Sequence, residues 1–293
     1  MRAVSAHVVE ELRARVARQG WPVGYAHLVT SAILPNDSES HGSPMFNGLS
    51  RWPALVLACA AAHGSVTEAA VQTAVAAALV MAALDVLDDV EDGELGPDAD
   101  PAVQVNVATG LLLLFHQVCG EPCLHALPAP GIQALVDAAL RACGGQHRDL
   151  CLQADGVEMN PEDALAITAA KSATLVAALC RLGALAGGCT GLLLARYAAF
   201  GHHLGMALQV ANDLAAAQDP SKTDLARHRP TLPLVYAAGY DADASAGTGH
   251  PTPEGALMAT WVVLQAHRLR ALRVLAAIER ARPARALLEP FLP

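Results

Sequence analysis

Lysine is almost missing from this chain of 293 residues, in which only Lys171 and Lys222 stand against 17 arginines. Aromatic residues are also scarce, at 4% of the sequence, so few ring faces are available for stacking or for contact with cations. The formal net charge of −9 gives no overall basic surface of the kind that nucleic-acid binding needs. We therefore expect no nucleic-acid partner.

Long apolar runs are absent too. No uninterrupted run reaches the roughly 18 residues of a membrane-spanning helix, and the N-terminal stretch MRAVSAHVVEELRARV is charged and amphipathic, unlike a signal peptide. The negative net charge also disfavours binding to anionic lipid. The seven cysteines are odd in number and have mostly apolar neighbours, which indicates reduced, buried thiols. We expect a cytoplasmic protein without a membrane span.

What the chain does contain is helical periodicity, with no β-type alternation and no internal repeat. Loops rich in Gly, Pro, Ser and Asp separate the apolar segments, and no shift in composition marks a domain boundary. Helices are expected over 4–19, 52–62, 65–92, 102–118, 131–152, 160–185, 190–217, 231–239 and 255–281. This pattern predicts an all-α fold, a bundle of about ten helices forming one domain over residues 1–293.

One acidic stretch, DVLDDVED at 85–92, closes the long apolar run that begins at Ala70. Its aspartates are spaced i, i+3, i+4 and i+7, which places four carboxylates on one face of a helix. The like charges repel one another, and they lie at a helix C-terminus, where the helix dipole also opposes them. A solvated acidic helix end would show the same pattern, but a divalent metal such as Mg²⁺ would compensate the charge and bridge it to a phosphate.

A second stretch, QVANDL at 209–214, ends another apolar helix with Gln209, Asn212 and Asp213 on one face. Bases follow it, and Lys or Arg side chains can take phosphate oxygens that metal ions leave free. Taken alone, this stretch fits a polar helix end slightly better than a ligand site. Two acidic helix ends facing each other across a bundle would hold metal ions and, through them, a diphosphate.

Together and in this order, these motifs resemble the trans-isoprenyl diphosphate synthase superfamily. Further matching segments are GQ with DL at 145–150, KSATL at 171–175, RLGA at 181–184 and TLPL at 231–234. The resemblance covers roughly residues 45 to 240. It implies a class I terpenoid synthase fold with a central apolar cavity, a homodimer, three Mg²⁺ ions, and a prenyl diphosphate substrate that ionises to an allylic carbocation.

Carried over position by position, the resemblance makes Asp88 and Asp92 metal ligands, with Asp89 supporting them. In the second motif Asn212 would take the ligand position, with Asp213 beside it. These five residues are the expected catalytic group. The side chains expected near the diphosphate are Gln209, Lys171, Lys222 and Arg229.

The sequence also departs from the chain-elongating members of the family. Where these carry several cations for a second diphosphate, the stretch NGLSRWP at 47–53 keeps only Arg51, and residues 93–104 contain no basic residue. In the second motif Ala216 and Pro220 stand where further metal ligands are expected. Because a second diphosphate would be poorly neutralised, these departures argue against elongation.

On this basis we expect a Mg²⁺-dependent class I terpene cyclase, a lyase that ionises one prenyl diphosphate and cyclises the cation. The alternative is a prenyltransferase, acting on a peptide or indole acceptor or elongating a prenyl diphosphate. The pattern QVNVATGLL at 104–112 resembles both bacterial cyclases and peptide-modifying isoprenyltransferases. A third hypothesis is a non-catalytic regulatory subunit, which the intact DDVED stretch opposes.

Three further residues enter the expected substrate pocket. The dipoles of Asn106 and Gln146 would help to stabilise a carbocation in a chain with so few aromatic rings. Ala83 lies five residues before Asp88, where the resemblance implies that side-chain size sets the depth of the pocket. The small side chain predicts a substrate of C20 or longer.

Overall fold

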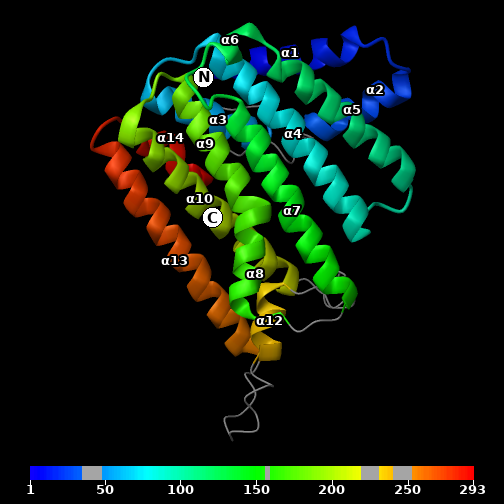
Figure 1. Ribbon diagram of the computed structural model, residues 1–293, viewed down its shortest axis with the longest axis vertical. Coiled ribbons are helices and arrows are strands. Elements are labelled where there is room, and N and C mark those ends of the chain that lie inside the picture. The colour runs from blue at the N-terminus through cyan, green and yellow to red at the C-terminus, as the bar shows by residue number, and fades with distance from the viewer. Residues whose placement is uncertain (35–47, 156–158, 219–230, 240–252) are drawn as a thin grey trace, which may run out of the picture. The chain divides into compact units, whose positions relative to one another are not determined.

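The computed structural model describes residues 1–34, 48–155, 159–218, 231–239 and 253–293, and within these ranges it contains helices and turns but no strand (Figure 1). The predicted all-α fold class is confirmed. Contacts along the chain group it into two compact units. The predictions of one domain and of a central apolar cavity stay predictions.

The first unit comprises Met1–Ala134, Leu179–Leu194 and Arg282–Leu288. Its helices are α1 (Arg2–Arg18), α2 (Val23–Ile33), α3 (Arg51–His63), α4 (Glu68–Asp92), α5 (Pro101–Cys119), α6 (Pro122–His125), the later part of α9 (Thr174–Ala186) and α14 (Arg285–Leu288). Helix α2, 11 residues without an acidic residue, lysine or arginine, was not predicted from the sequence.

Helix α4 is the core of the first unit and contacts α1, α2, α3, α5 and α6. Every residue from Ala70 to Ala83 is buried, as expected for a helix that is apolar on all sides. Most of these residues are alanine or valine, and such small side chains let the surrounding helices approach closely. The helix begins at the N-cap Thr67, whose hydroxyl accepts a hydrogen bond from the Ala70 amide and donates one to the Ala186 carbonyl. The helix therefore begins at Glu68, later than the predicted start at residue 65.

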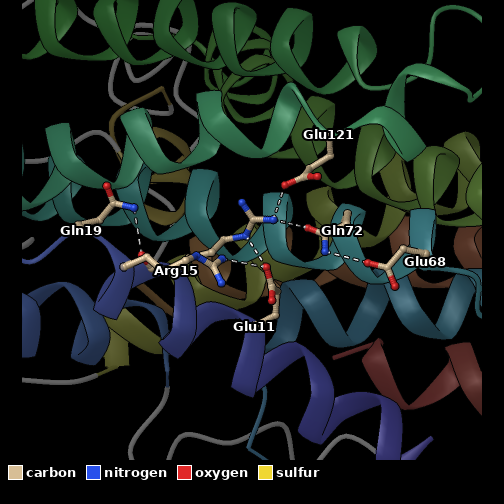
Figure 2. Close-up of polar contacts among 7 residues, drawn as sticks. Glu11, Arg15, Gln19, Glu68, Gln72 and Glu121 are labelled. Carbon is tan, nitrogen blue, oxygen red and sulfur yellow. Dashed lines mark hydrogen bonds and ion pairs between the residues drawn. The ribbon is translucent and has the colours of Figure 1, made fainter.

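A polar network crosses this otherwise apolar unit, centred on Arg15 of α1 (Figure 2). The guanidinium Nη2 donates to Gln72 Oε1 of α4 at 2.9 Å and to Glu121 Oε1 at the start of α6 at 2.6 Å. Its Nε lies 2.9 Å from Glu11 Oε1 in an i, i+4 ion pair. Arg15 is 7% exposed, so one buried cation joins three helices.

The second unit comprises Leu135–Ala178, Ala195–Ala281 and Glu289–Pro293. Its elements are most of α7 (Gln133–Asp155), α8 (Pro161–Thr168), the π-helical turn η2 (Ala169–Ala173), the start of α9, most of α10 (Gly191–Gln218), α12 (Leu232–Gly239), α13 (Pro253–Glu279) and the 3₁₀ turn η4 (Glu289–Phe291). Helix α12 contacts both α8 and α13. The buried core cluster consists of Met159, Ala164, Ile167, Ala207, Val210, Leu214, Leu232, Val235 and Leu264.

Three histidines meet inside the second unit between α10 and α13. The Nδ1 atoms of His203 and His267 lie 3.3 Å apart, and the His202 ring stands edge-on to His203 with 5.3 Å between centroids. Burial, followed by the charges of His203, Arg270 and His202, lowers the pKa of His267 to about 4. The neutral imidazole is therefore the form that fits the folded protein.

This depressed pKa predicts acid sensitivity. The unfolded state takes up the proton near the ordinary pKa of about 6.5, so stability is lost as the pH falls from there toward 4, by about 2–3 kcal/mol for His267. Denaturant titrations at pH 7 and pH 4.5 should show this loss, and His267→Gln should remove much of it. The exposed His116→Gln is the control, and an equal loss in the His267 variant and the wild type would contradict the prediction.

Three helical stretches of the described residues are long and apolar enough to span a membrane by length and composition: Glu68–Asp92, Pro101–Cys119 and Pro161–Ala186. The most apolar window of the first is 78% buried within the protein, those of the other two 39% and 44%. Apolar helices are needed for the core of an all-α protein, so these properties alone do not separate the two uses. The absence of a membrane span stays a prediction.

Candidate active site

The acidic turn of α4 begins where the buried part of that helix ends. Ala83 is fully buried, Leu84 is half-buried, and the aspartates follow directly. Asp88 and Asp92, four residues apart, are both half-buried on one face, whereas Asp85 and Asp89 are exposed. The Oδ1 atom of Asp88 is shielded from solvent. The two half-buried carboxylates are the ones predicted to ligate metal.

The end of α4 is fixed by Gly93, which has the left-handed φ of 62°. The amides of Gly93 and Glu94 turn back to the carbonyls of Val90 and Asp89 at 3.1 and 2.8 Å. Such a cap satisfies carbonyls at the helix end without a basic side chain. The negative end of the helix dipole therefore adds to the charge of the aspartates, and the turn is a strongly electronegative feature.

These carboxylates fit a magnesium site of the kind in which the protein supplies only part of the coordination shell. Asp88 and Asp92 are hard oxygen ligands one helical turn apart. Among the residues that the structure describes, no three His, Cys, Asp or Glu side chains group closely enough to enclose a metal ion. Mg²⁺ is commonly held by one or two carboxylates and completed by water and by substrate phosphates.

The second predicted motif, on α10 in the second unit, is held by a chain of hydrogen bonds. The Ser172 hydroxyl donates to Gln209 Oε1 at 3.1 Å, and Gln209 Nε2 donates to Asp213 Oδ1 at 3.1 Å. Asp213 Oδ2 accepts a hydrogen bond at 3.2 Å from the backbone amide of Leu232, and Leu232 is the first residue of α12. Asp213 thus joins α10 to the start of the TLPL helix, while its neighbour Asn212 is exposed and points away from the core of the unit.

Lys171 lies in the π-helical turn η2, which separates α8 from α9. The sequence had predicted one continuous helix over residues 160–185. Its Nζ lies 3.8 Å from Asp149 Oδ2 of α7. A π turn carries one extra residue and breaks the α-helical hydrogen-bond register, and such turns are frequent at functional sites. The turn changes the direction of the Lys171 and Ser172 side chains relative to a regular helix.

Two glycines allow the neighbouring helices to press against this turn. A Cβ atom at Gly145 of α7 would lie 2.8 Å from the Lys171 amide nitrogen and 2.9 Å from Ala170 Cβ. A Cβ atom at Gly205 of α10 would lie 2.7 Å from Ala173 Cα. Neither neighbour is the end of a flexible side chain, so no larger residue fits without moving the backbone that carries Lys171.

Gly145→Ala should therefore destabilise the protein by about 1–3 kcal/mol and lower its activity by displacing Lys171. The adjacent Gly144→Ala is a matched control, because a Cβ there meets nothing within 4 Å. In the same helix that change should stabilise by about 0.5–1 kcal/mol. Thermal unfolding and activity assays of the two variants test this, and similar behaviour of both would show that the close approach is unimportant.

The remaining predicted residues are placed as follows. Gln146 is half-buried on α7, and its Oε1 is shielded from solvent. Asn106 is exposed on α5, and its carbonyl accepts a hydrogen bond from the Tyr25 hydroxyl at 2.8 Å. Lys222 and Arg229 lie outside the described residues, as does Pro220. In the second unit the structure thus brings Gln209 together with Asp213. In the first unit it places Asp88 and Asp92 on one face of α4.

Sequence reasoning missed two contributors to this arrangement. Ser172 orients Gln209, and Asp149 pairs with Lys171, although both residues lay inside segments that had been recognised. Spacing alone gives no signal for contacts between different helices. The π turn was also missed, because the sequence of Ala169–Ala173 contains no residue that breaks a helix.

The structure describes Arg51, the basic residue that the NGLSRWP stretch keeps. Arg51 is the first residue of α3, and desolvation lowers the pKa of its guanidinium. No basic residue occurs between Gly93 and Gln104, as read from the sequence. Of these two segments, only the NGLSRWP stretch therefore retains a basic residue, Arg51.

Comparison with known proteins places the chain in a family. The polyprenyl synthetase family profile matches residues 48–247, and the chain belongs to that family. A geranylgeranyl diphosphate synthase of Mycobacterium tuberculosis is 33% identical over 212 residues, covering 66% of this chain and 59% of that protein. A (2E,6E)-farnesyl diphosphate synthase of Mycobacterium bovis is 26% identical over 246 residues, covering 77% and 64%. The chain thus spans about three fifths of the length of these relatives.

Solved structures show the same fold at lower identity. A polyprenyl synthetase from Streptomyces coelicolor A3(2) matches with a TM-score of 0.72 and 23% identity over 99% of this chain and 95% of that one. A polyprenyl synthase from Caulobacter crescentus, solved in complex with calcium and isoprenyl diphosphate, matches with a TM-score of 0.70 and 21% identity over 98% and 96%. The fold of this chain is therefore the isoprenyl diphosphate synthase fold, as the resemblance implied.

These relatives correct the functional expectation. The chain is similar to diphosphate synthases named for C20 and C15 products, and the prediction of a terpene cyclase, with its classification as a lyase, is wrong. The prediction had rested on cations missing from two short segments. A diphosphate can be neutralised by metal ions and by cations elsewhere in the chain, so their loss in those segments did not exclude a second diphosphate.

Proposed function

We propose that this chain is an elongating prenyltransferase, which joins an allylic prenyl diphosphate to isopentenyl diphosphate. The observation that carries the proposal is the half-buried Asp88–Asp92 pair at the end of a buried helix, in a chain of the polyprenyl synthetase family. The names of the mycobacterial relatives, both diphosphate synthases, support elongation.

In the proposed reaction the C1–O bond of the allylic diphosphate breaks, and diphosphate leaves with the electron pair. The double bond of isopentenyl diphosphate then attacks the allylic carbon, a new C–C bond forms, and a proton is lost to restore a double bond. Mg²⁺, three ions by the family resemblance, would be held by Asp88, Asp92 and Asn212 and would neutralise the leaving diphosphate. The calcium and isoprenyl diphosphate in the Caulobacter relative support a divalent metal.

The residues of the second unit would bind and orient the diphosphate. Lys171 offers a cation whose position is fixed by Asp149 and by the π turn. Gln209 is oriented by Ser172 and Asp213, so its amide has a defined direction. Such fixed donors stabilise developing negative charge because little reorganisation is needed during the reaction. Lys222 and Arg229 are proposed for the same role on the family pattern alone.

In an elongating enzyme the side chain at Ala83 bears on the length of the product, so in place of the predicted substrate of C20 or longer we propose a product of C20 or longer. Ala83 lies five residues before Asp88, about 7.5 Å along the helix axis, and its small side chain is fully buried. A prenyl chain growing alongside α4 from the acidic turn would pass this position. The name of the Mycobacterium tuberculosis relative, a geranylgeranyl diphosphate synthase, agrees with a C20 product.

The test is incubation with Mg²⁺, labelled isopentenyl diphosphate and C10 or C15 allylic diphosphate, followed by chromatography of the products. Label should enter linear products up to C20 or beyond, and Ala83→Phe should shorten them, while Ala102→Phe on the exposed side of α5 should not. Absence of label from any prenyl product would overturn the proposed function. Unchanged product length in the Ala83 variant would overturn only the assignment of chain length.

A homodimer is proposed through α5. Val105, Leu112 and Leu113 are exposed on one side of this helix, which has no charged residue from Pro101 to Cys119. Such an exposed apolar face is typical of a subunit interface. Light scattering should give twice the mass of the chain, and Leu113→Glu should reduce it to that of one chain. Leu192→Glu, at an exposed leucine elsewhere in the first unit, should not, and a wild-type monomer would disprove the proposal.

The expected cytoplasmic location stays a prediction.

A further inference from the structure

Helix α13 carries apolar residues on two opposite sides. One side, with Ala256, Thr260, Leu264, His267, Ala271, Leu275 and Ile278, is buried in the second unit. The other side exposes Met258, Trp261, Val262 and Leu269, with exposed fractions of 60%, 49%, 54% and 51%. The spacing i, i+3, i+4 and i+11 places these four residues in one stripe along the helix. A helix that is apolar on both sides is normally covered on both sides.

Arginines border this stripe. At 100° per residue, Arg273 lies next to the stripe on one side, and Arg270 lies further round on the same side. Both side chains are exposed, and no carboxylate among the described residues forms an ion pair with either of them. Between Glu254 and Glu279 the helix contains no acidic residue, so this segment is locally basic although the whole chain is negative. The surface that fits it is apolar and anionic.

We propose that the exposed face of α13 binds the surface of an anionic lipid bilayer. An apolar stripe that includes a tryptophan and is bordered by arginines is the pattern of a helix that lies in a membrane interface. Because its other side is buried in the protein, α13 would lie on the bilayer and not cross it. Exposed arginines attract anionic headgroups, which a net charge summed over the whole chain does not reveal.

A second copy of this chain is the competing occupant, and charge decides against it. Each copy has a net charge of −9, but the acidic groups needed to meet Arg270 and Arg273 are absent from α13 between its two ends. In a symmetric pairing a residue meets its own copy only at the two-fold axis, so within α13 only Glu254 and Glu279, at its two ends, could meet these arginines. An anionic bilayer instead supplies negative charge next to an apolar layer.

The experiment is flotation of the full chain with vesicles of phosphatidylcholine alone or containing 30% phosphatidylglycerol, the composition that serves as the anionic probe. The wild type should bind the anionic vesicles and not the neutral ones, and 0.5 M salt should weaken binding. The variant Met258→Gln/Trp261→Gln/Val262→Gln should lose binding about tenfold or more, and Arg270→Gln/Arg273→Gln should lose a similar factor.

The matched control replaces three exposed apolar residues elsewhere, Val23→Gln/Leu140→Gln/Leu192→Gln, whose exposed fractions are 87%, 66% and 85%. This variant should bind as the wild type does, and circular dichroism should show all variants folded. Absence of wild-type binding, or equal binding by the α13 variants, would overturn the proposal. A lower mass of the α13 triple variant in light scattering would also overturn it, because a second copy would then cover this face.

Discussion

Asp88→Asn should lower kcat/KM for prenyl transfer by roughly 10³-fold, the scale of losing one preorganised charge that acts on the leaving group. The substitution keeps the size of the side chain but removes its negative charge. The stability of the protein should change in the opposite direction. Asp88 lies near the C-terminus of α4 among other carboxylates, so neutralising it relieves repulsion and should stabilise by about 0.3–1 kcal/mol.

Steady-state kinetics at saturating Mg²⁺, together with thermal unfolding, would show both effects in one variant. Asp98→Asn is the matched control, since it makes the same chemical change in the exposed segment after the acidic turn. The control should change kcat/KM by less than threefold. Activity of Asp88→Asn within threefold of the wild type would show that the α4 turn does not hold the catalytic metal, even if elongation itself were observed.

Arg15→Leu should destabilise the protein by about 3–5 kcal/mol, the range found when one partner of a buried charge pair is removed. The substitution leaves Glu121 without its cation, leaves Glu11 with only the exposed Arg18, and takes away the donor to Gln72 Oε1 (Figure 2). These groups belong to three helices, and two of them are largely shielded from water. For a chain of this size the melting temperature should fall by roughly 5–8 °C.

The neighbouring Arg18→Leu provides the control, because Arg18 forms an ion pair with the same Glu11 at 3.3 Å but its side chain is 57% exposed. An exposed pair contributes at most about 1 kcal/mol, and often nothing measurable. Equal melting temperatures for the two variants would contradict the role of Arg15 as the buried centre of this network. The comparison also separates the loss of burial and hydrogen bonding from the simple loss of one positive charge.

The sequence was sufficient to predict a helix wherever one segment carries a clear pattern of its own. Long apolar runs located α4 and α10, and the predicted start of a helix at residue 160 agrees with α8, where Asn160 Oδ1 accepts from the Asp163 amide at 2.8 Å. Helix α2 was missed because its 11 residues make only about three helical turns, which leaves little length over which a helical period can be recognised. The Arg15 network was also missed, since an arginine on a charged helix gives no sign that it is buried.

The same distinction holds for the candidate site: contacts within one helix were predictable, and contacts between helices were not. Residues within one motif, such as Asp88 and Asp92, follow from helical spacing, but contacts between helices, such as Ser172 with Gln209, do not. The choice of reaction was wrong for a related reason. Counting basic residues in two segments measured what was missing locally, whereas the neutralisation of a diphosphate depends on every charge that the fold brings near it.

The π turn at Ala169–Ala173 has a consequence for insertions and deletions. It holds one residue more than an α-helical turn, so the helical path from Pro161 to Ala186 contains one surplus residue. Deleting that residue would restore an unbroken α-helix and rotate the segment before it by about 100° relative to the segment after it. Ala164 and Ile167 would then turn away from the core that they share with Val210, while Leu175 and Val176 stayed in place. The surplus residue thus sets the rotational phase between the two halves of this helix, and a one-residue deletion here should be far more harmful than one in a loop.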